Sequence, residues 1–274
     1  MNNHILFLLF LTFLTISPQD RGIKVNLIPT FVENQEKKYS IIYSVQTNTD
    51  GTKQIINKTK KQVDIKVISI HDDIIDMQWK YTDIEFIEST YINNPFTALM
   101  NTLCAGITIK YSTDKSGVIK SITNRNEIST KLRESIDEKL TLFINENNID
   151  SSKVLATKSQ LQMIFSDHSQ IDKIIIGDLF KFHQLYGNEY SEQPTKIIVN
   201  SDIWLESHEV VLKSIDKSNQ TCLLLSNLVN DSSKEINGSF EYNLSDYWLI
   251  NHRSQIASFT PLDVMQFYQI QQLP

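Results

Sequence analysis

The sequence predicts an α+β fold in which two antiparallel β-meanders flank a central segment of about three helices. Apolar and polar residues alternate over much of residues 38–90, a period of two that is typical of half-buried strands. Residues 124–187 carry apolar stripes at helical spacing, and residues 188–274 return to a β-rich composition. We therefore expect one α+β domain over residues 20–274, with a first β half (20–123), a helical segment (124–187) and a second β half (188–274).

The N-terminal residues predict the compartment. Residues 5–16, ILFLLFLTFLTI, form an unbroken run of twelve mostly apolar residues. A bilayer-spanning helix needs about 20 residues, so this run suits the apolar part of a secretory signal peptide instead. We expect residues 1–19 to be a signal peptide and the protein to be exported, to the periplasm or the medium. An N-terminal membrane anchor and an ordinary buried segment are the alternatives. No later stretch approaches 18 apolar residues, so no further span is expected.

The first β half is predicted from its alternation and its turns. In IIDMQWKYTDIEF, the side chains of Ile75, Met77, Trp79 and Tyr81 should share one face. A hairpin is expected at residues 106–123, where GITIKYS, the turn TDKSG and VIKSIT follow one another.

The helical segment should begin at about residue 124 and stop at Gly187. A first helix carries one apolar stripe, and a second is expected to start near residue 150. For a third, Ser169 and Asp172 fit the S-x-x-D capping pattern, and Gly187 supplies a left-handed stop. The first and third stripes comprise Ile128, Leu132, Ile136, Leu140 and Phe143, and Ile171, Ile175, Leu179, Phe182 and Tyr186.

The two β halves contain similar patterns, which suggests an internal duplication. VDIKVIS precedes IKY-x6-VI in the first half, and VVLKSID precedes FEY-x6-LI in the second. Two such meanders, each with one apolar face, could close over a single core. Chance similarity between two β-rich segments is the alternative. The matched pairs are Val63 with Val210, Ile65 with Leu212, Lys66 with Lys213, Ile68 with Ile215, Ile75 with Cys222, Met77 with Leu224, Tyr111 with Tyr242, Val118 with Leu249 and Ile119 with Ile250.

Several short motifs resemble a group of uncharacterised exported β-rich proteins of Bacteroidota-type bacteria. They are the strand KKYSIIYSVQT, the hairpin pattern of Asp114, Gly117 and Ile119, and FKFHQLYG at the end of a helix. The second half departs from the pattern, because Trp248 stands where the turn glycine would be. The resemblance implies export and this architecture, and it implies no activity.

Composition and motif searches exclude several chemistries. The net charge of −6 argues against a nucleic-acid-binding surface, which is usually basic. The seven glycines are too far apart for a phosphate-binding loop, and G-x-S-x-G, H-E-x-x-H and C-x-x-C are absent. The clusters HDDIID and SDHSQID are interpreted as a solvated turn and a helix cap, and His183 as a buried, satisfied histidine. We expect no catalytic residues, no metal and no cofactor. An enzyme whose Ser, His and Asp residues are dispersed along the sequence is the alternative, because such residues need not be neighbours in the chain.

The expected function is therefore binding. An apolar or lipidic small ligand would lie between the two β halves, and aromatic side chains would line its cavity; the alternative is a filled core made of the same side chains. A second hypothesis is a structural or interaction protein that binds an envelope protein. Cys104 and Cys222 could pair in an oxidising compartment, but both also sit in apolar settings that suit free core cysteines. The candidate ligand-binding residues are Trp79, Phe86, Tyr111, Phe240 and Trp248.

Overall fold

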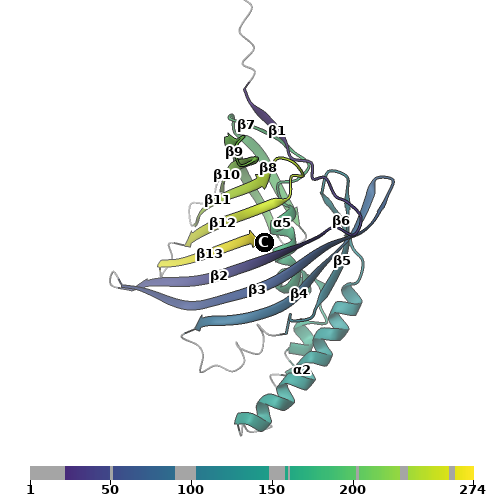
Figure 1. Ribbon diagram of the computed structural model, residues 1–274. Helices are drawn as coiled ribbons and strands as arrows, with labels where there is room; N and C mark the ends of the chain where they lie inside the picture. Colours follow the sequence, from purple (N-terminus) through teal and green to yellow (C-terminus); the bar gives the residue numbers. More distant parts are fainter. Residues whose placement is uncertain are drawn as a thin grey trace, which may run out of the picture.

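The computed structural model is dominated by an 11-stranded antiparallel sheet that curls around a short helix, α5 (Figure 1). The strand order is β6-β5-β4-β3-β2-β13-β12-β11-β10-β9-β8, and β1 and β7 form a separate two-stranded sheet. The structure describes residues 22–49, 52–89, 103–147, 158–159, 161–201, 204–228, 234–258 and 263–274. The expected signal peptide lies outside these residues.

Two consecutive meanders make up the large sheet, as the sequence predicted for the antiparallel halves. The first meander comprises β2 (Glu36–Thr49), β3 (Thr52–His71), β4 (Ile74–Ser89), β5 (Thr108–Asp114) and β6 (Ile119–Ile122). The second comprises β8 (Thr195–Ser201), β9 (Trp204–Asp216), β10 (Thr221–Leu228), β11 (Lys234–Asn243), β12 (Leu249–Ser258) and β13 (Asp263–Gln272). Every neighbouring pair is antiparallel, an arrangement that short turns can connect, although residues 90–107 separate β4 from β5.

The two meanders join edge to edge through β2 and β13. Their antiparallel register runs from Asp263 opposite Asn48 to Gln272 opposite Tyr39, a continuous ladder of ten residue pairs. This ladder removes the free edge that each meander would otherwise present, and exposed edges favour aggregation. The two halves therefore share one sheet and one core.

The inner face of the sheet is apolar because the strands alternate. Ile75, Met77, Trp79 and Tyr81 are all buried, which confirms the predicted face of β4. The register of β3 with β4 shifts between Val67 and Ser69, which marks a β-bulge.

The helical elements with defined bounds are α2 (Arg125–Asn147), α4 (His168–Ile171), the π-helical turn η1 (Asp172–Ile176) and α5 (Gly177–His183), and the described residues 158–159 and 161–164 are also helical. They follow β6 in the chain, and α2 lies beside the β4 and β5 side of the sheet in Figure 1. The predicted third stripe is buried from Ile171 to Tyr186, and Gly187 has the left-handed φ of 80° that ends the segment. The second expected helix falls largely outside the described residues, as does the side chain of Phe143.

The predicted capping box of Ser169 and Asp172 is wrong. Asp167 is the N-cap of α4, and its carboxylate accepts a hydrogen bond from the backbone N–H of Ser169. Asp172 lies inside the helical segment and is buried, where its carboxylate pairs with the Arg125 guanidinium at 2.8–3.2 Å. A long-range ion pair therefore explains Asp172, and sequence spacing alone could not show it.

The N-terminal segment closes one end of the curled sheet. β1 (Lys24–Asn26) pairs with β7 (Glu189–Ser191), and residues 27–35 then cross to β3, where Asn34 N donates to Val67 O. Phe31 packs edge-on against Trp248 with ring centroids 5.3 Å apart. This end is therefore sealed by chain from the first β half lying on a turn of the second.

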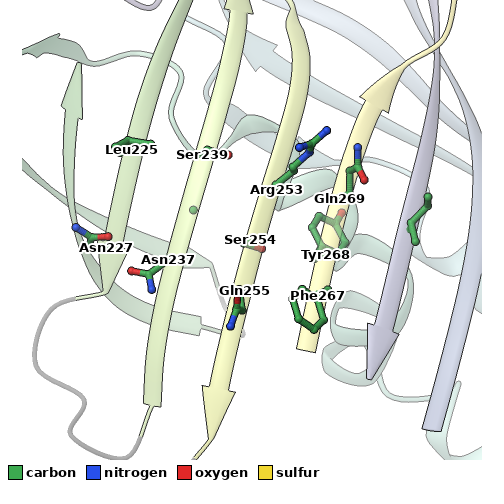
Figure 2. Close-up of a pocket in the computed structure, with 12 residues that line it drawn as sticks. Leu225, Asn227, Asn237, Ser239, Arg253, Ser254, Gln255, Phe267, Tyr268 and Gln269 are labelled. Carbon is green, nitrogen blue, oxygen red and sulfur yellow. The ribbon is translucent and has the colours of Figure 1, made fainter. Parts of the chain in front are cut away.

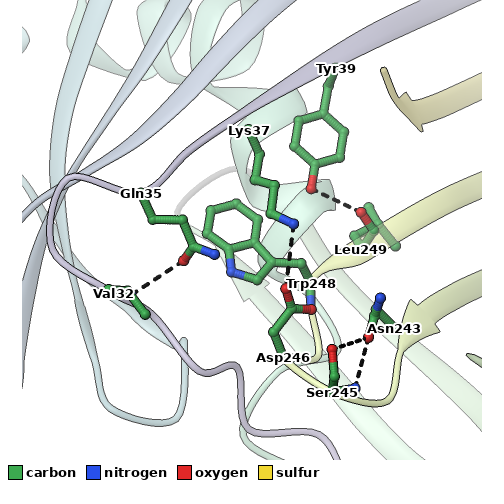
Figure 3. A network of polar contacts seen from close by, with 9 residues as sticks. All are labelled: Val32, Gln35, Lys37, Tyr39, Asn243, Ser245, Asp246, Trp248 and Leu249. Atoms are coloured by element: carbon green, nitrogen blue, oxygen red, sulfur yellow. Dashed lines mark hydrogen bonds and ion pairs between the residues drawn. The ribbon is translucent and has the colours of Figure 1, made fainter. Parts of the chain in front are cut away.

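Polar contacts fix the same end. The Lys37 ammonium reaches past the Trp248 ring to the Asp246 carboxylate, 3.4 Å away (Figure 3). The Tyr39 hydroxyl donates to Leu249 O at 2.9 Å. Asn243 Oδ1 accepts from Ser245 N at 2.7 Å and stabilises the β11–β12 turn.

Candidate ligand-binding site

The structure buries four of the five predicted aromatic residues: Trp79, Tyr111 and Phe240 lie on the inner face of the sheet, and Trp248 lies in the turn between β11 and β12. Trp79, Tyr111, Phe240 and Trp248 are at most 1% exposed, and α5 packs against this face. Phe86 lies on β4 opposite Thr59, but its side chain is outside the described part of the structure. Whether these residues bind a ligand stays a prediction.

Phe182 of α5 occupies the centre of this aromatic group. Its ring centroid lies 5.2 Å from that of Tyr39, 5.8 Å from Trp79 and 6.2 Å from Trp248, all in edge-to-face geometry. The inner face around Phe182 is therefore packed with protein side chains, which is the filled-core alternative for this part of the molecule.

A buried carboxylate anchors α5 to three strands. Asp178 accepts hydrogen bonds from Lys61 Nζ of β3 at 2.8 Å, from the Tyr81 hydroxyl of β4 at 3.0 Å and from the Tyr268 hydroxyl of β13 at 3.0 Å. The Lys181 ammonium lies 3.9 Å above the Tyr268 ring. Because the strands belong to both β halves, this contact holds the helix across their junction.

The Asp178 carboxylate and the Lys61 ammonium each stabilise the charged form of the other. Burial alone would raise the pKa of Asp178, but the Lys61 ammonium and the hydrogen bonds outweigh it and the pKa lies below its ordinary value. Burial alone would lower the pKa of Lys61, and the Asp178 carboxylate raises it overall. The pair is therefore ionised, and we assign it a structural role.

His183 is buried and fully hydrogen-bonded, as predicted. Its Nδ1 lies 2.8 Å from the carbonyl oxygen of Gly117, so Nδ1 carries the proton. Its Nε2 lies 3.1 Å from the Tyr111 hydroxyl, which then donates to it. Burial lowers the pKa of His183 to about 4, so the neutral ring is the form that fits.

A second buried histidine has no such partners. Among the described residues, neither ring nitrogen of His252 on β12 has a hydrogen-bond partner, and the ring stacks on Phe240 with centroids 4.0 Å apart. Burial lowers the pKa of His252 to about 3, with smaller contributions from Lys181 and His208. The inner face therefore holds this ring in its neutral form.

The disulfide considered from the sequence is not formed. Cys104 and Cys222 are both free and buried. Cys104 lies in the turn before β5, beside β4, whereas Cys222 lies on β10, and five strands separate β4 from β10 in the sheet. Burial raises the pKa of each thiol to about 11.

The two polar clusters from the sequence have structural roles. HDDIID forms the turn between β3 and β4, where Asp72 has a φ of 46°, and Asp73 pairs with Lys115 at 2.9 Å. In SDHSQID, Asp167 caps α4. Among the described residues, no group of three or more His, Cys, Asp or Glu side chains is placed to hold a metal ion.

A pocket of about 580 Å³ lies on the outer face of the sheet, across β2 and β10 to β13 (Figure 2). Successive side chains of a strand point to opposite faces, and direct cross-strand neighbours point to the same face. The register of the lining residues therefore shows on which face of the sheet the pocket lies. Ile42, Gln269, Arg253, Ser239 and Leu225 are consecutive cross-strand neighbours in one row. Tyr43 and Tyr268, one residue further along β2 and β13, belong to the inner row that meets α5.

The pocket combines an apolar floor with amides and one cation. Ile42, Leu225 and Phe267 supply the apolar surface. Asn227, Asn237 and Gln255 supply amide groups in the adjacent row, where each is opposite the next. Arg253 is the only charged side chain among the residues that line the pocket. A pocket of this size and composition suits a small ligand with a mainly apolar body.

None of the predicted binding residues lines this pocket. The sequence carried a signal for it nonetheless: Arg253 is the only arginine after Arg133, and it interrupts a β-type run, NHRSQIAS. That signal could not be read from sequence alone, because the neighbours that shape the pocket come from strands up to 227 residues apart, Ile42 and Gln269.

Comparisons with known proteins define no family. No family model matches the chain, and no curated protein matches it. Among solved structures, the chain is similar to one described as "lipid-protein interactions in lipovitellin", with a TM-score of 0.44 and 8% identity. The match covers 89% of this chain but only 25% of the other, so the chain spans about a quarter of that protein's length. None of the described helices has the length and apolar character to cross a bilayer.

Proposed function

We propose that this protein binds a small apolar or lipidic ligand without catalysing a reaction, and that the ligand lies in the outer-face pocket at the junction of the two β halves. The observation that carries the proposal is the pocket itself: about 580 Å³, with Ile42, Leu225 and Phe267 as its apolar surface. The sequence predicted a site on the inner face, but α5 fills that face around Phe182. The site that we propose therefore lies on the outer face of the same junction.

Burial of apolar ligand surface supplies the affinity. Each methylene group removed from water contributes about 0.8 kcal/mol, so a chain of several carbons can bind measurably even in an open pocket. The polar groups in the next row, including Gln255 and Asn237, then orient the ligand.

A substitution that fills the pocket tests the proposal. Ser239 is half-buried in the pocket on β11, and an aromatic residue is readily accepted in a strand, so Ser239→Phe should occupy the space that the ligand needs. Ser214→Phe is the matched control, because Ser214 is an exposed residue of β9 that does not line the pocket. The measurement is a fluorescence titration with Nile red, a neutral apolar probe, and its displacement by 1-decanol.

The wild type and Ser214→Phe should bind both molecules, and Ser239→Phe should bind at least tenfold more weakly with an unchanged melting temperature. If the wild type binds neither molecule, or if Ser239→Phe binds as the wild type does, the proposed site is refuted.

Export is part of the proposal and rests on the apolar run of residues 5–16 followed by the charged residues Asp20 and Arg21. The resemblance of the sequence to exported Bacteroidota-type proteins also supports export. Cell fractionation with an N-terminal sequence of the recovered protein tests it. Recovery of the protein from the exported fraction with about 19 residues removed is expected, whereas an intact N-terminus would contradict it.

We also infer that the two β halves derive from one duplicated unit. Five of the matched pairs fall on corresponding strands, β3 with β9, β4 with β10 and β5 with β11, and have all ten residues buried: Val63 with Val210, Ile65 with Leu212, Ile75 with Cys222, Met77 with Leu224 and Tyr111 with Tyr242. Ile119 and Ile250 also fall on corresponding strands, β6 and β12, but are only partly buried. The common burial supports this inference. An alignment of related sequences in which both halves converge on one pattern would test it.

A further inference from the structure

We propose that the ligand of the outer-face pocket is an amphiphile with an anionic head group, a long-chain carboxylate, and that Arg253 binds this group. The inference rests on the proposed function, because it assigns the chemistry of the same site. It is carried by the position of one charged side chain in a row of neutral ones.

Arg253 lies near the middle of the pocket and has no ionic partner there. Its direct cross-strand neighbours are Ser239 on β11 and Gln269 on β13, and the next residues in that row are Leu225 and Ile42. None of the twelve lining residues is acidic. Within the described part of the chain, no carboxylate forms an ion pair with Arg253.

The neutral neighbours do not use the guanidinium either. The Gln269 side-chain amide donates instead to Asn251 Oδ1 and Gln271 Oε1, both at 3.3 Å. Figure 2 shows Arg253 extending from β12 toward Gln269 on β13. The N–H groups of the guanidinium are therefore available to a ligand, and their planar arrangement matches a carboxylate.

Lys60, further along the same cross-strand row, differs from Arg253 because it has an acidic cross-strand neighbour. Lys60 of β3 lies beyond Ile42, and its other cross-strand neighbour is the acidic Glu85. Arg253 has no acidic residue on either side. Glu241, two residues along β11 from Ser239 on the same face, is the diagonal neighbour of Arg253, but it does not line the pocket and no ion pair joins the two in the described structure. Arg253 is thus the only charged side chain among the lining residues.

The net charge of the chain disfavours anion binding, so the affinity for an anion must come from the direct contact with Arg253. The chain carries a net charge of −6, which repels an anion at long range. At physiological salt the Debye length is about 8 Å, so distant charges are screened while a contact with Arg253 is not. The apolar tail would then lie over Leu225 and Phe267, and Gln255, two residues along β12 on the same face, could donate to the second carboxylate oxygen.

Decanoate and 1-decanol form a matched pair that separates this inference from the proposed function. They have the same chain length and differ in head-group charge near neutral pH. Wild-type protein should bind decanoate about tenfold more tightly than decanol, because a charge-assisted hydrogen bond at an exposed site adds a modest amount. The preference should weaken when the salt concentration is raised.

Two substitutions of Arg253 test the contact. In Arg253→Gln, decanoate should bind about tenfold more weakly than to the wild type, and the preference for decanoate over decanol should be lost. Arg253→Lys should keep part of the preference, because the charge remains but the fork geometry is lost. Lys213→Gln is the control: Lys213 is an exposed cation of β9 outside the pocket, and both affinities should stay at the wild-type level.

The outcomes are distinguishable. If the wild type binds decanol and decanoate equally, or if Arg253→Gln keeps the preference, the anionic head group is refuted and the apolar site stands. If neither molecule binds to the wild type, the proposed function itself fails.

Discussion

Lys61 of β3 and Asp178 of α5 form an ion pair of 2.8 Å beneath the curled sheet, with side chains only 19% and 13% exposed. Asp178 also accepts hydrogen bonds from Tyr81 and Tyr268, so one carboxylate receives donors from both β halves. We expect this cluster to decide how firmly α5 is held.

Removing the Asp178 charge should destabilise the protein markedly. Asp178→Asn leaves the Lys61 ammonium largely buried without its counter-ion, which costs about 3 kcal/mol in comparable pairs. The double variant Lys61→Met/Asp178→Asn should recover part of this loss, because no charge is then left unpaired. Urea denaturation of the wild type, Asp178→Asn, Lys61→Met and the double variant measures the coupling energy of the pair. Additive effects of the two substitutions would show that the pair does not act as a unit.

Stability should fall as the pH is lowered through the range in which free histidine titrates. His183 and His252 have pKa values of about 4 and about 3 in the folded protein, both below the ordinary 6.5. The unfolded chain therefore binds more protons than the folded chain below about pH 6.5, and the unfolding free energy decreases until the folded-state pKa values are reached. Between pH 6.5 and 5 the expected loss is about 3 kcal/mol for the two histidines together.

Comparison of histidine variants assigns this pH dependence. His183→Gln should show about half of the loss over the same range, measured by urea denaturation at each pH. His168→Asn is the control, because His168 is exposed at the start of α4, and its curve should parallel that of the wild type. An unchanged pH dependence in His183→Gln would rule out His183 as a source of the effect.

Both thiols should be present but unreactive in the folded protein. Cys104 and Cys222 are free and buried, and burial raises the pKa of each to about 11, so little thiolate exists near neutral pH. Ellman's reagent should label neither thiol in the native protein and both in guanidinium chloride without a reductant. The absence of free thiols in the unreduced, denatured sample would show that they had paired.

Local patterns predicted the elements whose causes are local. The β4 face from Ile75 to Tyr81 follows from a period of two, and the stripe from Ile128 to Leu140 in α2 follows from a helical period. Gly187 ends the helical segment because a left-handed residue is favourable for glycine, and this too is visible in the sequence. The burial of the apolar residues in these elements could be predicted without knowing which residues they contact.

The cap of α4 shows where local reasoning stopped. Ser169 and Asp172 matched a capping pattern, but Asp172 pairs with Arg125, 47 residues earlier, and Asp167 takes the capping role. Both carboxylates suit a helix start, and only the tertiary ion pair distinguishes them. The same limit applies to the binding site, since two of the aromatic residues chosen from the sequence, Trp79 and Trp248, pack against Phe182, whereas the pocket lies on the opposite face of the sheet.

The sequence by itself determined the antiparallel halves, the faces of their strands and the helical segment between them, because period and turn chemistry act over a few residues. Only the tertiary structure decided that β2 and β13 join into one sheet, that α5 fills its inner face, and that Arg253 lies alone in an outer pocket. Those features depend on register and on contacts between residues distant in the chain, and periodicity does not record which strand lies beside which.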